Sequence, residues 1–417
     1  MIATGVGMLA RSLLVTALLT GLGSNLFAQT STANLPAVYS TTPMTRDADL
    51  TLTASILSVA AADNGLAALS SVFRAPRPGG RLARVARVAL FDVPVTVYFT
   101  GLNHEWGHQT SADEFGVRSH LSFATPWSSR QFRLQQTSST PPGVLVTPVI
   151  HGGGLEASRR FKDGAEARMR RTERIAPGHA LATIAAAMEM PIYAWHDLSP
   201  GRFSNVPSGE GDIDTLVFDL AYRLPVTSLG ELDQLRHRVR ARALLNLLDS
   251  GLWSEIAGLA VDHVWNGEES ARVRWLPAGA VKVLPWIRYD WSPYGPEYYA
   301  GSHFRTSRMN GNAYVRRAAA LQGDRLMGAG ASVSMPSLSR TFAGRDHEIV
   351  PTLEFDLWSH TSEGRGVHAA IGAELDDWPS RRAALTVAVG AKSRGHLIGY
   401  ALDAGPYATF GLTVRVW

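Results

Sequence analysis

Cysteine is absent from this chain of 417 residues. Disulfide bonds and thiolate metal ligands are therefore excluded, and any zinc would have to be held by His, Asp or Glu. Lysine occurs at only three positions, and the formal net charge is a modest +4. Because no nucleic-acid-binding module accompanies this charge, we expect no nucleic-acid partner. The Gly-x-Ser-x-Gly pattern is also missing, as is a glycine-rich phosphate loop after a strand, so serine esterases and nucleotide-binding enzymes find no support.

The N-terminus has the pattern of a signal peptide, which we assign to residues 1–29. Arg11 provides positive charge ahead of an apolar run at residues 13–22. That run is shorter than the roughly 20 residues needed by a spanning helix. We expect cleavage near Ala28, with an uncleaved anchor as the alternative, and a Ser-, Thr- and Pro-rich leader at residues 30–49. An exported chain without disulfides suits the periplasm or outer membrane of a Gram-negative bacterium.

The length and the 45% hydrophobic content predict a large core divided between two domains. Residues 50–276 carry apolar residues at helical spacing, whereas residues 277–417 alternate between apolar and polar residues in short runs. We therefore expect an α+β protein with a helical N-terminal domain and an antiparallel β-rich C-terminal domain, forming a barrel or partial barrel. The aromatic end at Trp417 resembles the last strand of outer-membrane barrels. The alternative to a full outer-membrane barrel is a partial barrel that is soluble or docked to the membrane. We expect the protein to associate with a membrane.

More local patterns predict individual elements. Besides the helix discussed next, helices are expected at residues 50–73, 155–173, 179–194 and 228–265, the last divided near Gly251. Strands are expected at residues 280–291, 326–335, 349–359, 367–375, 383–391, 397–402 and 407–417.

The motif His104-Glu105-Trp106-Gly107-His108 is expected to lie on a helix of about six turns. Asp92 and Pro94 favour a helix start, and Gly116 favours its end. Histidines four residues apart project from the same side of a helix, so both imidazoles can reach one zinc ion. Glu105 lies about 100° around the helix from His104 and can act as general base on a metal-bound water without being a ligand.

A catalytic zinc needs a third protein ligand, and the preferred candidate is Glu156. It follows the glycines at 152–154, where a backbone without side chains can approach another helix closely. Its alternative role is an ion pair one helical turn away, with Arg159 or Arg160. The competing ligands are His151, His179 and His196. His196 is next to Asp197, and a histidine beside an aspartate is more typical of a structural hydrogen-bonding pair. Glu114 is expected to be solvated. Its alternative role is to orient one of the imidazoles through a hydrogen bond.

With these residues the sequence resembles the zincin metallopeptidases whose third ligand is glutamate, and among them a poorly characterised set of bacterial envelope proteins. The resemblance rests on His104 to Gln109 with Ala112, Glu114 and Gly116, on Gly153 to Glu156, and on Pro293 to Tyr299. It implies that His104, His108 and Glu156 are zinc ligands, that Glu105 is the base, and that the activity is peptide cleavage.

Two further segments carry weaker signals. The basic residues between Arg159 and Arg171 could face lipid phosphates, but the interspersed acidic residues favour a solvated helix face. The segment Pro293–Tyr299 is rich in Tyr, Pro and Gly, and ordinary loop packing is favoured over a substrate groove or a membrane interface.

The sequence thus predicts a zinc-dependent hydrolase of the bacterial envelope that acts on a peptide or lipid-linked substrate. The alternative is a non-catalytic outer-membrane barrel or scaffold protein whose metal site is structural or lost.

Overall fold

The computed structural model describes thirteen segments of the chain. They are residues 80–122, 133–136, 146–175, 177–198, 211–223, 226, 228–268, 270–318, 326–342, 345–361, 364–378, 383–398 and 404–414. The predicted signal peptide, the leader, the helices expected before residue 74 and Trp417 lie outside the described residues.

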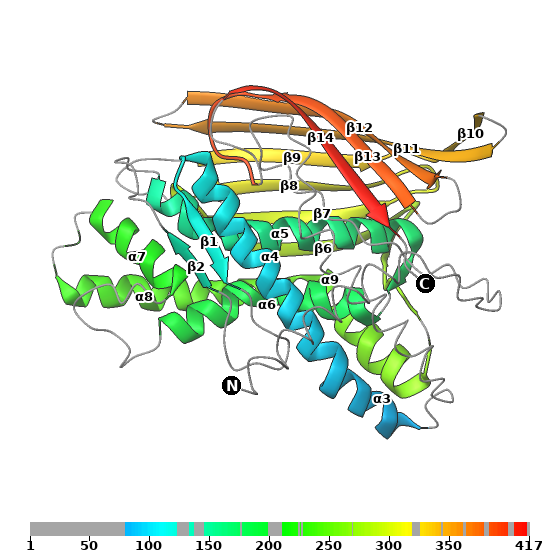
Figure 1. The fold of residues 1–417 in the computed structure, drawn as a ribbon, viewed down its shortest axis with the longest axis horizontal. Helices are drawn as coiled ribbons and strands as arrows, with labels where there is room; N and C mark the ends of the chain where they lie inside the picture. Colours follow the sequence, from blue (N-terminus) through cyan, green and yellow to red (C-terminus); the bar gives the residue numbers. More distant parts are fainter. Residues whose placement is uncertain are drawn as a thin grey trace, which may run out of the picture.

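Helices come first along the described chain and long strands follow, which confirms the predicted α+β class (Figure 1). The large sheet forms one layer and most helices lie beneath it, with α5 running along the sheet. No helix of the described part is long and apolar enough to cross a membrane. The helices are α3 (Arg81–Arg87), η1 (Val88–Asp92), α4 (Val93–Glu114), α5 (Val146–Thr172), α6 (Pro177–Asp197), α7 (Asp212–Arg223), α8 (Leu229–Ala243), η2 (Leu244–Leu248), α9 (Ser250–Ala257) and η3 (Gly258–Asn266).

Helix α4 carries the histidine motif and ends where the sequence predicts. Gly116 adopts a left-handed φ of +67°, and the amide of Val117 donates to the carbonyl of Ala112, as in a Schellman cap. The start differs from the prediction, because α3 and the π-helical η1 lead directly into α4. Asp92 is therefore inside a longer helix rather than at its start. The π turn ahead of Pro94 suits a residue that has no amide hydrogen to donate.

Helix α5 begins at Val146, well before its predicted start, so the three glycines at 152–154 lie inside the helix. Glycine in a helix interior costs up to about 1 kcal/mol relative to alanine. Close packing explains two of them, Gly153 and Gly154; a Cβ on Gly107 of α4 would overlap the backbone of Gly153. A Cβ on Gly153 would in turn overlap Ser111. The two helices therefore meet backbone to backbone, which brings α5 beside the histidine motif.

The large sheet is antiparallel, as predicted, and its strands follow the order β14-β13-β12-β11-β9-β8-β7-β6-β5, with β10 beside β11. The two end strands β5 and β14 do not pair with each other within the described residues, so the sheet is open. Two short ribbons, β1–β2 and β3–β4, complete the strands. The strands are β1 (Ser119–Ser122), β2 (Arg133–Gln136), β3 (Arg174–Ile175), β4 (Ala271–Arg272), β5 (Leu276–Ala278), β6 (Val281–Ser292), β7 (Gly295–Arg305), β8 (Asn310–Ala318), β9 (Leu326–Ser334), β10 (Leu338–Phe342), β11 (Arg345–His360), β12 (Gly364–Trp378), β13 (Ala383–Lys392) and β14 (Gly405–Val414).

Eight of these strands were not predicted: the two long strands β7 and β8, and the six short ones β1 to β5 and β10. β7 begins inside the segment Pro293–Tyr299, which the sequence suggests is a loop, and β8 follows it by a hairpin. The turn at Pro293 and Tyr294 is closed by Gly295, whose φ of +120° is readily adopted only by glycine. In the strand expected at 397–402, the described residues 397 and 398 form only a bridge and a turn.

The basic face of α5 is buried against the sheet, so the predicted solvated face is wrong. Lys162 and Arg170 are 2% and 4% exposed. Lys162 pairs with Asp249 at 2.8 Å. Arg288 of β6 donates to the carboxylates of Asp163, Glu166 and Asp249 at 2.5, 3.1 and 3.2 Å. A buried charge persists only when it is paired in this way, and the sheet supplies the pairing cation.

The substitution Arg288→Met is expected to destabilise the fold by about 3–5 kcal/mol, because the buried carboxylates of Glu166 and Asp249 lose a cation that they share with the partly exposed Asp163. Lys282→Met is the matched control, since Lys282 is exposed and pairs with Glu173 at the surface. Its loss should cost less than about 1 kcal/mol. Urea unfolding of the two variants measures both effects. Equal losses would contradict the description of a network held by Arg288.

Candidate metal centre

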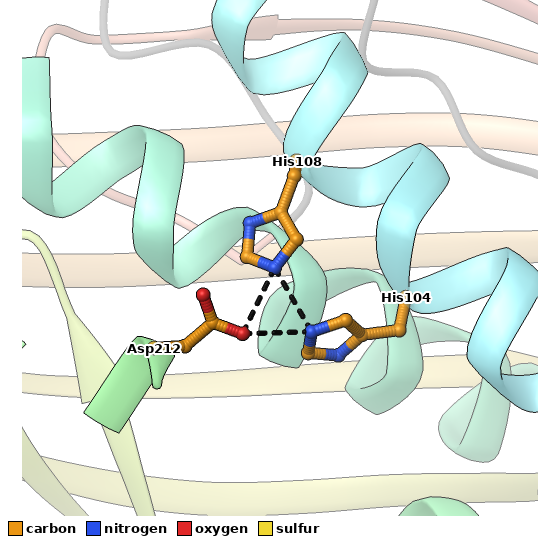
Figure 2. Close-up of side chains that lie close together, drawn as sticks. All are labelled: His104, His108 and Asp212. Carbon is orange, nitrogen blue, oxygen red and sulfur yellow. Dashed lines mark hydrogen bonds and ion pairs between the residues drawn. The ribbon is translucent and has the colours of Figure 1, made fainter. Parts of the chain in front are cut away.

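His104 and His108 lie one turn apart on α4 and are 1% and 6% exposed. Their rings point to the same place, with the two Nε2 atoms 2.9 Å apart (Figure 2). The predicted convergence of the two imidazoles is thus present in the structure.

Asp212, the first residue of α7, provides a third donor at the same place. Its Oδ2 lies 2.9 Å from the Nε2 of His104 and 3.1 Å from that of His108 (Figure 2). Three donors of a tetrahedral zinc ion would be about 3.3 Å apart, given bonds of about 2.0–2.1 Å. The observed triangle is slightly tighter than that value, and these three residues could hold a metal ion.

The far side of each imidazole has its own partner. The Nδ1 of His108 lies 2.7 Å from the carbonyl oxygen of Ile150, to which it can only donate. The Nδ1 of His104 lies 2.9 Å from Oε1 of Glu189 on α6. A partner that accepts the Nδ1 proton leaves the lone pair on Nε2, which is the tautomer that a metal ion requires.

Gly154 of α5 keeps space open beside the donor triangle. A Cβ at this position would lie 2.5 Å from the Nε2 atoms of both His104 and His108. The helix therefore needs glycine here, and the space that a methyl group would fill adjoins the two nitrogens. This is the arrangement expected where a cation must approach both rings.

The start of α7 is held in place by the end of α6. The carboxylate of Asp197 accepts a hydrogen bond from the backbone of Ile213. A Cβ on Gly211 would come within 2.5 Å of that carboxylate, so the chain passes close to it. These contacts fix the position from which Asp212 reaches the histidines.

The donor groups perturb one another strongly. Burial disfavours protonated His104, but Tyr193, Glu189 and Asp212 outweigh it and raise its pKa well above 6.5. Burial likewise opposes protonation of His108, and Asp212 raises its pKa nevertheless. For Asp212 burial acts to raise the pKa, yet the two histidines lower it well below 3.8. Without a metal ion, these interactions favour a proton on the imidazole pair and a negative charge on the carboxylate of Asp212.

These shifts predict that metal binding releases protons and strengthens with pH. A raised pKa means that a proton occupies an imidazole at neutral pH, and a metal ion must displace it. As the pH is lowered, the affinity for the metal ion should fall by up to about tenfold per pH unit for each proton displaced. Calorimetric titration with Zn²⁺ in buffers of different ionisation enthalpy measures this release directly. Binding without proton release at pH 7 would contradict it.

Glu105, the predicted base, is partly buried and follows His104 directly on α4. Its charge contributes to the raised pKa of His108 and to that of Tyr193. Charged His104 lowers the Tyr193 pKa, but burial and the nearby carboxylates raise it to about 12. The phenol therefore stays protonated at neutral pH and remains a hydrogen-bond donor.

Glu156, the predicted third ligand, does not belong to the group that Asp212 forms with the histidines. Its Oε2 lies 3.8 Å from the Nε2 of His396, a buried residue after β13. Gly154 faces the rings, and a residue two positions later on a helix points about 200° away from it. The structure thus assembles Asp212 where the sequence suggested Glu156.

The other histidine candidates have different surroundings. His151 is nearest the centre, with Nδ1 3.6 Å from Oδ1 of Asp212. His196 pairs with Asp197 at 3.0 Å, as a structural pair would. His179 is buried at the start of α6 and is not part of the donor group. The side chain of Glu114 lies outside what the structure describes.

Asp212 and the helix it begins were missed by the sequence analysis. The signal was present, because the buried residues Ile213, Leu216, Val217 and Leu220 follow helical spacing. Asp212 then stands in the first turn, where a carboxylate is favoured.

Comparisons of the chain with protein-family models, with curated proteins and with solved structures found no match.

Proposed function

We propose that this chain is a zinc-dependent hydrolase of the bacterial envelope that cleaves peptide bonds. The observation that carries the proposal is the convergence of His104, His108 and Asp212 on one point, with Glu105 next to it. Three protein donors leave one position open on a four-coordinate metal ion, which is typical of catalytic rather than structural zinc sites.

Zinc is favoured by the kind and spacing of the donors. Imidazole and carboxylate ligands suit zinc, and the two histidines lie four residues apart on a helix with a glutamate between them. Two histidines and one carboxylate also form ferrous sites, but that donor set does not need a neighbouring general base. The space beside Gly154 supports a fit, because an alanine there would collide with both donor nitrogens.

The protein's own groups have separate roles in this proposal. Zinc, when bound, would polarise the scissile carbonyl and lower the pKa of a water molecule towards about 7. Glu105 accepts a proton from the attacking water and passes it to the leaving amine. Glu189 and the carbonyl of Ile150 hold the rings of His104 and His108 in the ligating tautomer.

Cleavage that depends on the metal ion tests the proposal. The full chain, stripped with a chelator and then given Zn²⁺, should cleave members of a peptide library only after reconstitution. An acylated peptide set tests the lipid-linked substrate class in the same assay. Zinc binding with no cleavage of either set would instead favour a structural metal in a scaffold protein.

The third ligand is tested separately by Asp212→Asn and Glu156→Gln. We expect Asp212→Asn to weaken zinc binding by about 100-fold or more, because it replaces a charged donor with a neutral amide. Glu156→Gln should bind zinc like the parent. A competition titration against a chromophoric chelator measures both affinities, and the reverse order would restore Glu156 as the ligand.

A further inference from the structure

One face of the sheet points away from α5 and is almost wholly apolar. We call it the outer face, and it is made by alternate residues of β8, β9, β11, β12 and β13. The opposite face packs on α5, since Arg171 of α5 pairs with Glu374 of β12 at 2.8 Å. Strand pairing places the outer residues in continuous rows across the sheet. The three central rows are Val389-Ile371-Leu353-Val333, Ala391-Ala369-Phe355-Ala331-Ala313 and Val367-Leu357-Ala329-Val315.

The outer face of this sheet is apolar and yet exposed, unlike the exposed face of an ordinary water-soluble sheet. On the outer face, Ile371 and Val315 are each 58% exposed and Phe355 is 47% exposed. On the inner face, His368 and Asp356 are buried and bonded to each other at 2.9 Å. Soluble antiparallel sheets bury their apolar side and expose their polar side. The inner face buries aromatic side chains beside these polar groups, so the distinguishing feature is the exposed apolar outer face, which is typical of a sheet in contact with lipid.

The apolar area is also large and has a charged border. Along β11 it runs from Ile349 to Leu357, a length of about 27 Å at about 3.4 Å per residue. Beyond Leu357 the next row is Arg365-Ser359-Met327-Arg317, and both of its arginines are exposed.

We propose that the outer face binds a phospholipid membrane, with its aliphatic rows against the acyl chains and Arg317 and Arg365 at the headgroup phosphates. A patch of this extent marks an interaction surface. The central rows offer no charge or hydrogen-bonding side chain to a protein partner, whereas the arginine border matches anionic headgroups. The sheet rests on the membrane rather than crossing it, because hydrocarbon does not tolerate the backbone groups of an open sheet edge. This inference is independent of the metal centre.

Single-cysteine labelling tests the surface position by position, because the chain has no cysteine of its own. The full chain is labelled with a polarity-sensitive fluorophore at Ile371→Cys or at Leu229→Cys. Leu229, at the start of α8, is a matched control that is 61% exposed but outside the sheet. With vesicles carrying nitroxide on the acyl chains, the label at 371 should lose about half its emission or more, while the label at 229 keeps it.

The headgroup contact is tested by Arg317→Gln combined with Arg365→Gln. The double variant should bind vesicles of mixed phosphatidylcholine and phosphatidylglycerol about 30-fold more weakly, and it should match the parent on phosphatidylcholine alone. Equal quenching at 371 and 229, or none at 371, would overturn the proposal. So would a label at 371 that is already shielded without vesicles in a chain that sediments as a dimer. His108→Ala should leave the quenching unchanged, which separates this outcome from failure of the proposed hydrolase.

Discussion

Glu105→Gln is expected to retain one zinc ion per chain and parental stability while losing hydrolysis by about 10²- to 10⁴-fold. The amide has nearly the shape of the carboxylate but cannot accept a proton from the attacking water. The three proposed donors are unchanged in this variant, so metal binding should persist. Zinc analysis and the reconstituted cleavage assay together measure the two effects.

Glu268→Gln is the matched control for this variant, since Glu268 is exposed and follows η3, outside the donor group. It should cleave at the parental rate. Parental cleavage by Glu105→Gln would remove the general base from the mechanism. Loss of zinc from Glu105→Gln would instead make Glu105 part of the metal site.

Gly154→Ala is the second substitution with a large expected effect. Its methyl group would lie 2.5 Å from the Nε2 atoms of His104 and His108, so the rings must move or the metal position is obstructed. We expect zinc affinity to fall by about 100-fold or more, since a tetrahedral site tolerates little displacement of its donors. Overpacking of the helix contact should also cost about 1–3 kcal/mol of stability.

Gly152→Ala separates this effect from the general effect of alanine on a helix. A Cβ on Gly152 meets nothing within 4 Å. That variant should keep its zinc affinity and gain about 0.5–1 kcal/mol of stability, because alanine is the better helix former. Chelator competition and thermal unfolding of both variants decide the matter. Equal zinc affinities would show that Gly154 does not border the metal position.

The histidine helix could be predicted because its signals are local. Spacing alone places His104 and His108 on one side of a helix, and Gly116 ends that helix through its own backbone preference. The antiparallel sheet could be predicted for the same reason, since the alternation of apolar and polar residues along β11 to β13 lies within each strand. β7 and β8 were not predicted because glycine, asparagine and tyrosine interrupt the alternation of apolar and polar residues within them.

The third donor could not be predicted in the same way. Asp212 is more than a hundred residues from the histidines in sequence, and a place in the first turn of a helix does not mark an acidic residue as a metal ligand. Its place depends on the packing of α7 against α5 and α6. Glu156 attracted attention because it follows three glycines. Of these glycines, Gly153 and Gly154 instead contact α4, and Glu156 points about 200° away from Gly154, which faces the two rings.

The charged face of α5 shows a second limit of local patterns. Acidic and basic residues at three- and four-residue spacing are typical of a solvated helix, and Lys162, Glu166 and Arg170 have that spacing. They are buried because Arg288 of β6 and Asp249 before α9 complete their pairing across the interface. Only the tertiary structure brings these partners together.

X-ray absorption at the zinc edge, on the full chain dialysed after loading, measures whether His104 and His108 bind zinc. We expect one zinc ion per chain with two imidazole nitrogens and carboxylate oxygen at about 2.0–2.2 Å, and loss of an imidazole contribution in His108→Ala. A chain that retains no zinc, or zinc with no imidazole among its ligands, would contradict the account.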